Sequence, residues 1–471
     1  MIEIQIPGSK SITNRAIILA ALSKGTTILK NASVCDDSKF MINALKKLGV
    51  KIKQNDTTIK ITGLSSTFSK QKNKIKIYTG NAGTTMRFIT ALATLTDNKI
   101  IIDGDKRMRE RPIKELVKAL NKLGAKIKMT GDCPPLHIYP SKLHGGKISL
   151  PGNISSQYLS ALLLTAPFAS QPTSITIEQK LCSQPYIEMT LKVLKSFKIN
   201  IKNKNFRQFV VEPIKRTKTT QPTKTYEVES DASSASYIGA YSALHPNKTI
   251  LLKNIYKNSI QGDIKFLEYL KKMGCKTIEQ KNGTLVKVAS KLKSLGTVDM
   301  NKTPDLVMTF AVLALFTKGK TRITNIGNLR IKETDRISAL ENELKKLVEF
   351  YNLPVKVKTG QDWVEITGSK QPTLSSTSSD KVRISTDTKT PSGSERSEKV
   401  RISTKFKGHH AKLMPDSEKK LSISTYNDHR IAMSFGILTD LFRNLTIENP
   451  SCVSKSYTTF WKDLKKISKT K

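Results

Sequence analysis

The sequence predicts an α/β protein of more than one domain, built from repeated strand and helix units. Its 471 residues are more than one ordinary hydrophobic core holds, and 38% of them are hydrophobic, enough for globular folding. A lysine-rich helical pattern of the form L-K-K-L-G recurs six times. The copies begin at Leu45, Leu120, Leu194, Leu270, Leu344 and Leu464. The first four steps are 74 to 76 residues long, which chance does not readily explain.

Each copy of the pattern belongs to a larger unit. The helix often leads into a short alternating strand, as in LKKLGVKIK and LNKLGAKIK. The whole unit is therefore interpreted as strand, helix, strand, helix and further strands. A unit of this size is too large for a solenoid repeat and indicates domains with internal pseudo-symmetry. We expect Gly49, Gly124 and Gly274 to end their helices in the left-handed conformation.

The last step between copies is longer than the others. Residues 372–418 are rich in Ser, Thr, Lys and Pro, and the segments DKVRIST, EKVRIST and KKLSIST in and just after this range resemble tandem copies. This composition predicts a low-complexity insertion. Insertions of this kind are tolerated because loop-closure entropy grows slowly with length. We assign it no function.

The composition argues against membrane, disulfide-bonded and metal-binding classes. No apolar run reaches the roughly 18 residues that a membrane span needs. The start MIEIQIPGSK lacks a signal-peptide pattern, so we expect a cytoplasmic protein. The five cysteines are scattered without CxxC spacing, and the pair His409–His410 has no ligand at metal-binding spacing. We therefore expect neither a disulfide framework nor a metal.

The net charge of +42 raises the question of a nucleic-acid partner. The lysines, however, are spread along the whole chain, and aromatic residues make up only 6%. A nucleic-acid reader more often gathers basic residues around stacking rings. We interpret the charge as a general lysine bias that also attracts an anionic small substrate. An RNA-binding protein of similar repeat fold remains an alternative.

Residues suited to anions cluster at the predicted helix starts. In PGSKSITNRA, a Pro-Gly turn precedes a helix that Ser9 or Ser11 can cap, with two cations close by. Similar starts occur in TGNAGTTMRF, RMRERPI, GNISSQYLSALLL and CSQPYI. The second half adds TPDLVMTF, NLRIKETDR, STYNDHRIAMSF and SKSY. Helix N-termini carry partial positive charge, so their convergence would bind a ligand with two anionic groups.

Several of these motifs have simpler interpretations. Asp305 can be an ordinary helix cap, and KETDR can be a solvated helical face with paired charges. His429 and Arg430 can mark a capped helix start. Taken together, the motifs instead favour a cationic site, in which the carboxylates Asp305 and Glu333 are suited to proton transfer.

The motifs resemble those of the EPSP synthases, the 3-phosphoshikimate 1-carboxyvinyltransferases of the enolpyruvyl transferase family. PGSKSITNRA, GNAGTTMR, RMRERPI, SSQYLSALL, SQPYI, EVESDASSASY, NSIQGD, RIKETDR and YNDHR occur in the order of that family. The resemblance implies an inside-out α/β barrel fold of two similar globes, each of three βαβαββ units. It implies an N-terminal globe over 10–229, and a C-terminal globe over 1–9 and 230–471 that holds the insertion 372–418.

The resemblance also implies a reaction without metal or organic cofactor. The enolpyruvyl group of phosphoenolpyruvate would pass to the 5-hydroxyl of shikimate 3-phosphate through a tetrahedral intermediate, with release of phosphate. Catalysis would fall to Lys10, Asp305 and Glu333. Shikimate 3-phosphate would be bound by Lys10, Ser11, Arg15, Ser155, Ser156, Gln157, Ser183, Tyr186, Asp305, Asn328 and Lys332. Phosphoenolpyruvate would be bound by Lys10, Gly83, Arg111, Gln157, Arg336, Arg430 and Lys455.

The resemblance implies no partners beyond these two small molecules, and we expect a monomer that binds neither nucleic acid nor membrane. The nearest alternative is UDP-N-acetylglucosamine enolpyruvyl transferase, which shares the fold and the phosphoenolpyruvate chemistry. That family requires a reactive cysteine in a flexible loop, whereas GDKRMRERPI carries arginines there. A scaffold made inactive by its insertion is a further alternative.

Overall fold

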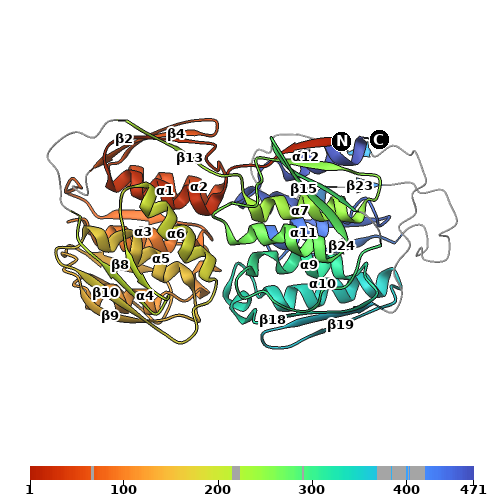
Figure 1. Ribbon diagram of the computed structural model, residues 1–471. Coiled ribbons are helices and arrows are strands. Elements are labelled where there is room, and N and C mark those ends of the chain that lie inside the picture. The colour runs from red at the N-terminus through yellow and green to blue at the C-terminus, as the bar shows by residue number, and fades with distance from the viewer. Residues whose placement is uncertain are drawn as a thin grey trace. The chain divides into compact units, whose positions relative to one another are not determined.

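The computed structural model describes residues 1–64, 68–214, 223–288, 291–368, 383–384, 399–400, 402–403 and 419–470. The chain forms two compact units (Figure 1). The first, called the N-terminal unit below, consists of residues 7–230 and 260–262. The second, the C-terminal unit, consists of residues 1–6, 231–259 and 263–471. The sequence-predicted insertion 372–418 lies outside the described residues except for three dipeptides, at 383–384, 399–400 and 402–403.

The N-terminal unit contains three four-stranded sheets, each with two helices. The first has the strand order β13-β2-β4-β3 and comprises α1 (Lys10–Leu22), β2 (Lys24–Lys30), α2 (Asp36–Lys47), β3 (Lys51–Asn55), β4 (Thr58–Leu64) and β13 (Lys224–Glu227). The second, β5-β6-β8-β7, comprises β5 (Ile75–Tyr78), α3 (Gly83–Ala93), β6 (Ile100–Asp103), α4 (Lys114–Lys122), β7 (Lys126–Met129) and β8 (Leu136–Tyr139). The third, β11-β12-β10-β9, comprises β9 (Gly146–Pro151), α5 (Ser156–Thr165), β10 (Thr173–Glu178), α6 (Gln184–Ser196), β11 (Lys202–Lys204) and β12 (Gln208–Val211).

The C-terminal unit repeats this plan, except that its third sheet has three strands in the described part of the chain. Its first sheet, β1-β14-β16-β15, comprises β1 (Ile2–Gln5), α7 (Ala232–Leu244), β14 (Ile250–Lys253), α8 (Phe266–Lys272), β15 (Cys275–Gln280) and β16 (Gly283–Val288). Its second, β17-β18-β20-β19, comprises β17 (Gly296–Asp299), α9 (Val307–Ala314), β18 (Gly319–Thr324), α10 (Arg336–Phe350), β19 (Val355–Thr359) and β20 (Val364–Gly368). Its third, β22-β25-β24, comprises β22 (Lys399–Val400), β24 (Leu421–Ile423), α11 (His429–Gly436), β25 (Leu445–Glu448) and α12 (Phe460–Lys469).

The first three strands of the sheet pair in the same way in all six repeats. The first two strands are parallel, as where Ile75 pairs with Ile100, and the strand next to them is antiparallel. The six copies of the L-K-K pattern fall in α2, α4, α6, α8, α10 and α12, so each marks the second helix of its repeat. Gly49, Gly124 and Gly274 have φ angles of 92°, 106° and 99°, which confirms their predicted left-handed conformation.

Two repeats depart locally from the common pattern. In the fifth, the segment LKKLVEFYN lies inside α10, which continues to Phe350, so the strand starts only at Val355. In the sixth, α12 is the last element that the structure describes, and the antiparallel strand β22 comes from earlier in the chain, pairing with β25. A parallel pair with a crossover helix leaves its outer edge open, and β22 covers that edge with backbone hydrogen bonds.

The first strand of each unit's opening sheet comes from a distant part of the chain. Strand β1, at the start of the chain, pairs with β14 in the C-terminal unit, whereas β13 pairs with β2 in the N-terminal unit. Gly8 and Ser230 form a backbone bridge, and the amide of Ser9 donates to the carbonyl of Glu229 at 2.8 Å. The start of α1 is therefore fixed to the end of the N-terminal unit by backbone bonds.

Within each unit, helices lie inside and sheets cover them (Figure 1). The first helix of a repeat is apolar on nearly all sides: α1 is buried from Ile12 to Leu22, and α7 is buried throughout. The second helix is amphipathic, and the strands alternate between buried and exposed residues, as β4 does. Because the first helices are otherwise buried and apolar, the polar residues at their N-termini are the candidates for binding and catalysis.

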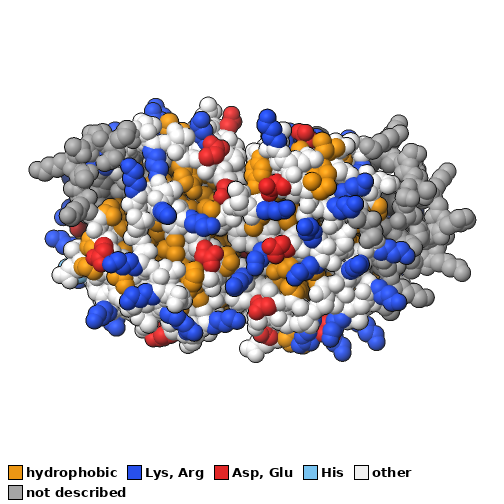
Figure 2. Space-filling model, viewed as in Figure 1, with side chains coloured by type: hydrophobic (Ala, Val, Ile, Leu, Met, Phe, Trp, Pro, Cys, Tyr) orange, Lys and Arg blue, Asp and Glu red, His pale blue; other side chains and the backbone are white. Residues whose placement is uncertain are grey.

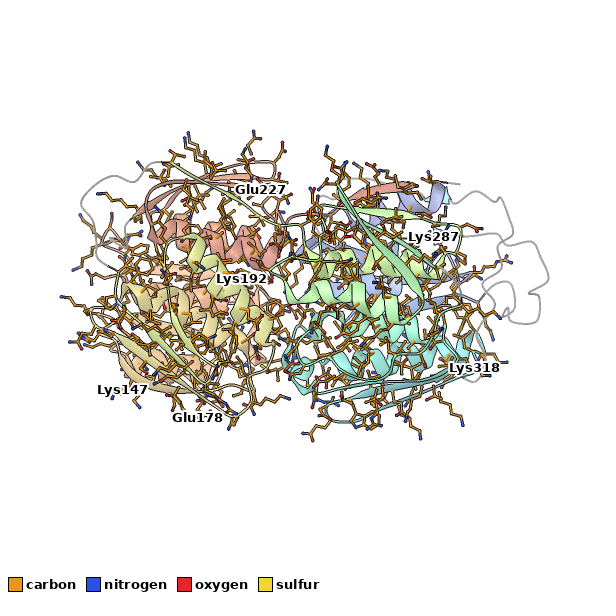
Figure 3. All side chains as sticks on the ribbon, in the orientation of Figure 1. Lys147, Glu178, Lys192, Glu227, Lys287 and Lys318 are labelled. Atoms are coloured by element: carbon orange, nitrogen blue, oxygen red, sulfur yellow. The ribbon has the colours of Figure 1, made fainter. Side chains whose placement is uncertain are left out.

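The lysines that give the chain its charge are spread over its surface. Lys147, Lys192, Lys287 and Lys318 are all exposed, and each comes from a different element or loop (Figure 3). On the face shown in Figure 2, basic side chains lie among acidic and neutral ones rather than in one patch. None of the helices described is long and apolar enough to cross a membrane.

Candidate active site

The sequence-predicted site residues fall into two clusters, one in each unit. In the N-terminal unit, they lie in or next to the first turns of α1, α3, α5 and α6, except Arg111, which follows the 3-10 helix Met108–Glu110 ahead of α4. Ser9 caps α1, since its hydroxyl accepts from the amide of Ile12 at 3.5 Å. Lys10 follows as the first helical residue, and its Nζ lies 3.1 Å from Oδ2 of Asp37. The lysine is therefore held at the helix start by a buried carboxylate.

Asp37 is a residue that the sequence analysis did not single out. It lies in the first turn of α2, where carboxylates are favourable, and its side chain is only 4% exposed. The hydroxyl of Thr85 donates to its carbonyl at 3.0 Å, which connects α2 to α3. The acidic pair in CDDSK was the available signal, although such a pair is also common at ordinary helix starts.

Arg15 is buried one turn into α1. Its Nη1 donates to the carbonyl of Ser11 at 2.8 Å, and its Nη2 donates to the carbonyl of Tyr186 at 3.2 Å. Burial, partly offset by Tyr186, lowers the pKa of Arg15 to about 10. The guanidinium is still charged at neutral pH, so it offers a fixed cation beside the start of α6.

Gly83 and Arg111 form a close pair at the start of α3. A Cβ atom on Gly83 would lie 2.5 Å from Nη2 of Arg111, so only glycine lets the guanidinium approach the helix start this closely. Nη1 of Arg111 donates to Oδ1 of Asn81 at 2.9 Å and to its carbonyl at 3.2 Å. Arg111 is 3% exposed. The arrangement is typical of an anion site made of helix amides and a guanidinium.

The starts of α5 and α6 supply hydroxyl and amide groups. Ser155 caps α5 by accepting from the amide of Gln157 at 3.3 Å, and Ser156 is the first helical residue. Nε2 of Gln157 donates to the hydroxyl of Thr84 at 3.2 Å, which joins α5 to α3. Ser183 precedes α6 in a left-handed conformation, with a φ of 53°. Together with the contacts of Lys10 with Asp37, of Thr85 with Asp37 and of Arg15 with Tyr186, the bond between Gln157 and Thr84 links α1, α3, α5 and α6 into one network.

In the C-terminal unit, Arg336 is the centre of the cluster. Its Nε lies 2.8 Å from Oδ2 of Asp428, its Nη2 lies 2.8 Å from Oε2 of Glu333, and its Nη1 lies 3.1 Å from Oδ1 of Asp305. Its side chain is 2% exposed. Burial opposes the charge, but these three carboxylates raise the pKa of Arg336 above its usual value. The guanidinium of Arg336 thus binds three carboxylates, which lie just before α9, α10 and α11 in the chain.

Asp305 lies between two arginines. It belongs to a short 3-10 turn (Pro304–Leu306) before α9, and its Oδ2 is 2.5 Å from Nη2 of Arg430. Burial alone would raise the pKa of Asp305, but Arg430, Arg336 and Lys332 outweigh it and hold that pKa well below its usual range. The helix-cap interpretation of Asp305 is wrong, because neither the turn nor α9 is capped by a side chain.

Glu333 and Lys455 complete the charged groups of this cluster. Nζ of Lys455 lies 3.6 Å from Oε1 of Glu333, and both side chains are about one-tenth exposed. Glu333 and Arg336 are therefore not a solvated helical face, as the simpler interpretation of KETDR would require. Asn328 lies in the short 3-10 helix Gly327–Ile331, directly before Lys332.

Two further carboxylates were missed by the sequence analysis. Asp428 caps α11 by accepting from the amide of Arg430 at 2.8 Å while it also binds Arg336. Asp263 is buried and accepts from the hydroxyl of Ser233. Burial, together with the charge of Asp305, raises the pKa of Asp263 to about 7. YNDHR and NSIQGD contained these residues, but a capping or loop role explained both equally well.

The two clusters differ in their charge balance. In the N-terminal unit, Lys10 pairs with the carboxylate of Asp37, whereas Arg15 and Arg111 have neutral partners such as Thr190 and Asn81, and this excess of cations suits the binding of anions. The C-terminal unit pairs its cations with Asp305, Glu333 and Asp428, which suits proton transfer beside an anion. Among the described residues, no group of three His, Cys, Asp or Glu side chains is arranged to hold a metal ion.

Comparison with known proteins gives one consistent result. The family model of EPSP synthase (3-phosphoshikimate 1-carboxyvinyltransferase) matches residues 2–388 and 400–464. The 3-phosphoshikimate 1-carboxyvinyltransferase of Buchnera aphidicola subsp. Cinara cedri is 41% identical, over 99% of this chain and 94% of that protein. The protein of the same name from Histophilus somni strain 2336 is 38% identical, over 99% and 96%. The solved EPSP synthase structure from Acinetobacter baumannii has a TM-score of 0.70 at 22% identity, covering 98% of this chain and 94% of that one, and shares the fold.

Proposed function

The chain belongs to the EPSP synthase (3-phosphoshikimate 1-carboxyvinyltransferase) family, and we propose how its own residues carry out that family's reaction. The enzyme transfers the enolpyruvyl group of phosphoenolpyruvate to the 5-hydroxyl of shikimate 3-phosphate and releases phosphate. The two substrates need different binding groups. One is a hydroxylated ring with a phosphate and a carboxylate, and the other is a small, highly charged enol phosphate.

Shikimate 3-phosphate is bound chiefly by the hydroxyl-rich helix starts of the N-terminal unit. Serine hydroxyls and backbone amides there can donate to phosphate oxygens, and Arg15 supplies a fixed positive charge. The residues proposed to contact it are Lys10, Ser11, Arg15, Ser155, Ser156, Gln157, Ser183 and Tyr186, with Asp305, Asn328 and Lys332 from the C-terminal unit.

Phosphoenolpyruvate is bound by residues from both clusters. Gly83 and Arg111 support this assignment in the N-terminal unit, because their close approach directs helix amides and a guanidinium to the same place. The other proposed contacts are Lys10, Gln157, Arg336, Arg430 and Lys455. Arginine suits this ligand because its planar fork can bind two oxygens of a phosphate or carboxylate at once.

Asp305 is the proposed base that takes the proton of the attacking 5-hydroxyl. With Arg430 at 2.5 Å and Arg336 at 3.1 Å, its carboxylate is ionised but weakly basic. When the anionic groups of phosphoenolpyruvate bind these arginines, their pull on Asp305 weakens and the pKa of Asp305 rises. The base then becomes stronger when its substrate is in place.

Glu333 is the proposed acid that protonates C3 of phosphoenolpyruvate, with Lys10 assisting. Protonation at C3 leaves C2 electron-poor, and the 5-hydroxyl oxygen adds there to give the tetrahedral intermediate. Loss of phosphate and of a proton from the same methyl carbon then restores the double bond. Fixed charges favour each step, because they need no reorganisation as charge develops. Binding of Glu333 by both Arg336 and Lys455 supports a fixed position for this carboxyl group.

The observation that carries this proposal is that Arg430 and Arg336 both bind the carboxylate of Asp305. Steady-state kinetics can test the proposal. Phosphate release should require both shikimate 3-phosphate and phosphoenolpyruvate. Asp305→Asn should lower kcat by about 10²- to 10⁴-fold, the range for a lost general base. Turnover with UDP-N-acetylglucosamine in place of shikimate 3-phosphate would contradict the proposed acceptor.

We also propose that the enzyme works as a monomer in the cytoplasm and binds no nucleic acid. The five cysteines, all in the described part of the chain, form no disulfide with one another, which is typical of reducing compartments. The interspersed surface charges of Figure 2 support a small-molecule role. Gel filtration with light scattering, and titration of RNA at several salt concentrations, test these points.

A further inference from the structure

Arg15 carries its charge among neutral hydrogen-bond partners. Besides the carbonyls of Ser11 and Tyr186, its acceptors are the hydroxyls of Thr190 at 2.8 Å and Ser160 at 3.2 Å. No carboxylate pairs with it among the described residues. A buried cation with only dipolar partners keeps its attraction for an anion, because nothing of opposite charge has cancelled it.

The directions of these hydrogen bonds follow from the chemistry of the hydroxyls. Thr190 has one hydroxyl hydrogen, and it points to the carbonyl of Tyr186 at 2.7 Å. The bond of 2.9 Å between Thr190 and Ser160 must then be donated by Ser160. Thr190 oxygen therefore accepts from both Ser160 and Nε of Arg15, which uses its full capacity. The two hydroxyls therefore bind the Nε and Nη2 edge of the guanidinium.

The ring of Phe88 packs against the guanidinium of Arg15. Its ring centre lies 5.4 Å from Cζ of Arg15, within the range of a cation–π contact, and the residue is 1% exposed. The bonds to Thr190, Ser160 and the two carbonyls use four of the five N–H groups of Arg15 in the described part of the chain. One N–H on Nη1 is left to donate to an oxygen of a ligand.

We propose that Thr190 and Ser160 are positioning residues for shikimate 3-phosphate, which hold the Arg15 guanidinium in its binding orientation before the substrate arrives. The inference rests on the proposed function, in which Arg15 binds this substrate. A side chain that is already ordered loses less conformational entropy on binding, so affinity rises without any new contact. Neither hydroxyl touches the substrate in this account.

Thr190→Val tests the proposal, because it keeps the shape of the side chain and removes the acceptor. Titration calorimetry without phosphoenolpyruvate should show about tenfold weaker binding of shikimate 3-phosphate, the cost of one hydrogen bond to a charged group. The KM for phosphoenolpyruvate should change less than twofold. Thr190→Ser, which restores the hydroxyl, should restore the affinity.

Thr165→Val is the matched control. Thr165 is also buried in a helix and also donates to the carbonyl four residues earlier, Ala161, at 2.9 Å, but it has no bond to Arg15. It should leave the affinity for shikimate 3-phosphate unchanged. Equal effects of the two valine variants, or an equal loss of affinity for both substrates, would overturn the proposal in favour of a structural role.

A double variant shows whether Thr190 acts through Arg15. In an Arg15→Gln background, Thr190→Val should cause no further loss, because the group that it positions is gone. A further tenfold loss in that background overturns the inference. If Arg15→Gln itself leaves binding unchanged, the proposed role of Arg15 fails. If Arg15→Gln weakens binding and Thr190→Val does not, only the positioning role fails.

Discussion

Arg336 and Asp428 form a two-point ion pair inside the C-terminal unit, with Nε 2.8 Å from Oδ2 and Nη2 3.3 Å from Oδ1. Their side chains are 2% and 0% exposed. Loss of Asp428 removes the only carboxylate described that binds Arg336 at two points, and it leaves the buried guanidinium with Glu333 and Asp305 alone. We therefore expect Asp428→Ala, which also removes the cap of α11, to lower the free energy of unfolding by about 3–5 kcal/mol. Urea denaturation followed by circular dichroism measures this.

A surface pair offers the control for that experiment. Asp36 and Lys39 lie 3.3 Å apart with side chains 38% and 58% exposed. Asp36→Ala should change the free energy of unfolding by less than about 1 kcal/mol, because water screens and replaces such a pair. A loss at Asp428 as small as that at Asp36 would show that Glu333 and Asp305 alone compensate the charge of Arg336.

Gly83→Ala should separate phosphoenolpyruvate binding from stability. The new methyl group would lie 2.5 Å from Nη2 of Arg111, so the guanidinium must move from its place beside Asn81. Alanine itself favours a helix, so the melting temperature should fall little or not at all. We expect the KM for phosphoenolpyruvate to rise about tenfold, and the Kd of shikimate 3-phosphate to change far less.

The role of the Arg111 guanidinium in this effect is tested by making Gly83→Ala in a protein that lacks this arginine. In an Arg111→Ala background, Gly83→Ala should cost nothing further in phosphoenolpyruvate affinity. Arg111→Ala alone should weaken phosphoenolpyruvate while sparing shikimate 3-phosphate. If both substrates lost affinity equally, the assignment of Arg111 to one of them would be wrong.

The repeat could be predicted from the sequence because the second helix of each unit is amphipathic and has a surface-facing lysine pattern. The regular spacing of this pattern runs from α2 through α4, α6 and α8 to α10. Strand β1 joins the first sheet of the C-terminal unit, and β13 joins the first sheet of the N-terminal unit. The local sequence pattern could not predict these pairings, because the partner strands, β14 and β2, are about 200 residues or more away along the chain. Only long-range pairing decides which sheet such a short strand joins.

The candidate site shows the same division. Lys10, Gly83, Asp305 and Arg336 could be proposed from the sequence because a helix start with polar residues has a recognisable local pattern. Asp37, Asp428 and Thr190 were missed, because each is a plausible ordinary residue of its helix. Their importance comes from contacts across elements, such as Asp428 with Arg336. A single sequence does not contain that information.

Asp263 should make stability depend on pH in the neutral range. Burial and the neighbouring charge of Asp305 raise its pKa from 3.8 to about 7. The folded protein therefore retains a proton that the unfolded chain has lost. The stabilisation that protonated Asp263 contributes is fully present below about pH 4. It decreases as pH rises above 4 and is lost once pH has risen through 7. The total is on the order of a few kcal/mol.

Asp263→Asn is the variant that isolates this effect. The amide cannot ionise, so the free energy of unfolding of the variant should change less between pH 5 and pH 8 than that of the parent. Ser233→Ala removes the hydroxyl that donates to the carboxyl group and is the companion variant. Because that bond lowers the pKa of Asp263, its loss should move the transition to higher pH. Parallel pH curves for the parent and Asp263→Asn would show that another group is responsible.

Deletion of residues 372–418 should leave turnover nearly unchanged. None of the residues in either cluster lies in this range, and Asp428, the nearest of them, is fixed by its bonds to Arg336 and to the start of α11. Deletion of 372–398 alone keeps β22, which pairs through Lys399 and Val400 with β25. The longer deletion removes this strand and should lower the melting temperature more than the shorter one, because it exposes the edge of β25. Phosphate release and thermal unfolding measure the two effects separately. A large gain in kcat for both deletions would mean that the segment inhibits the enzyme, and loss of activity in both would mean that catalysis requires it.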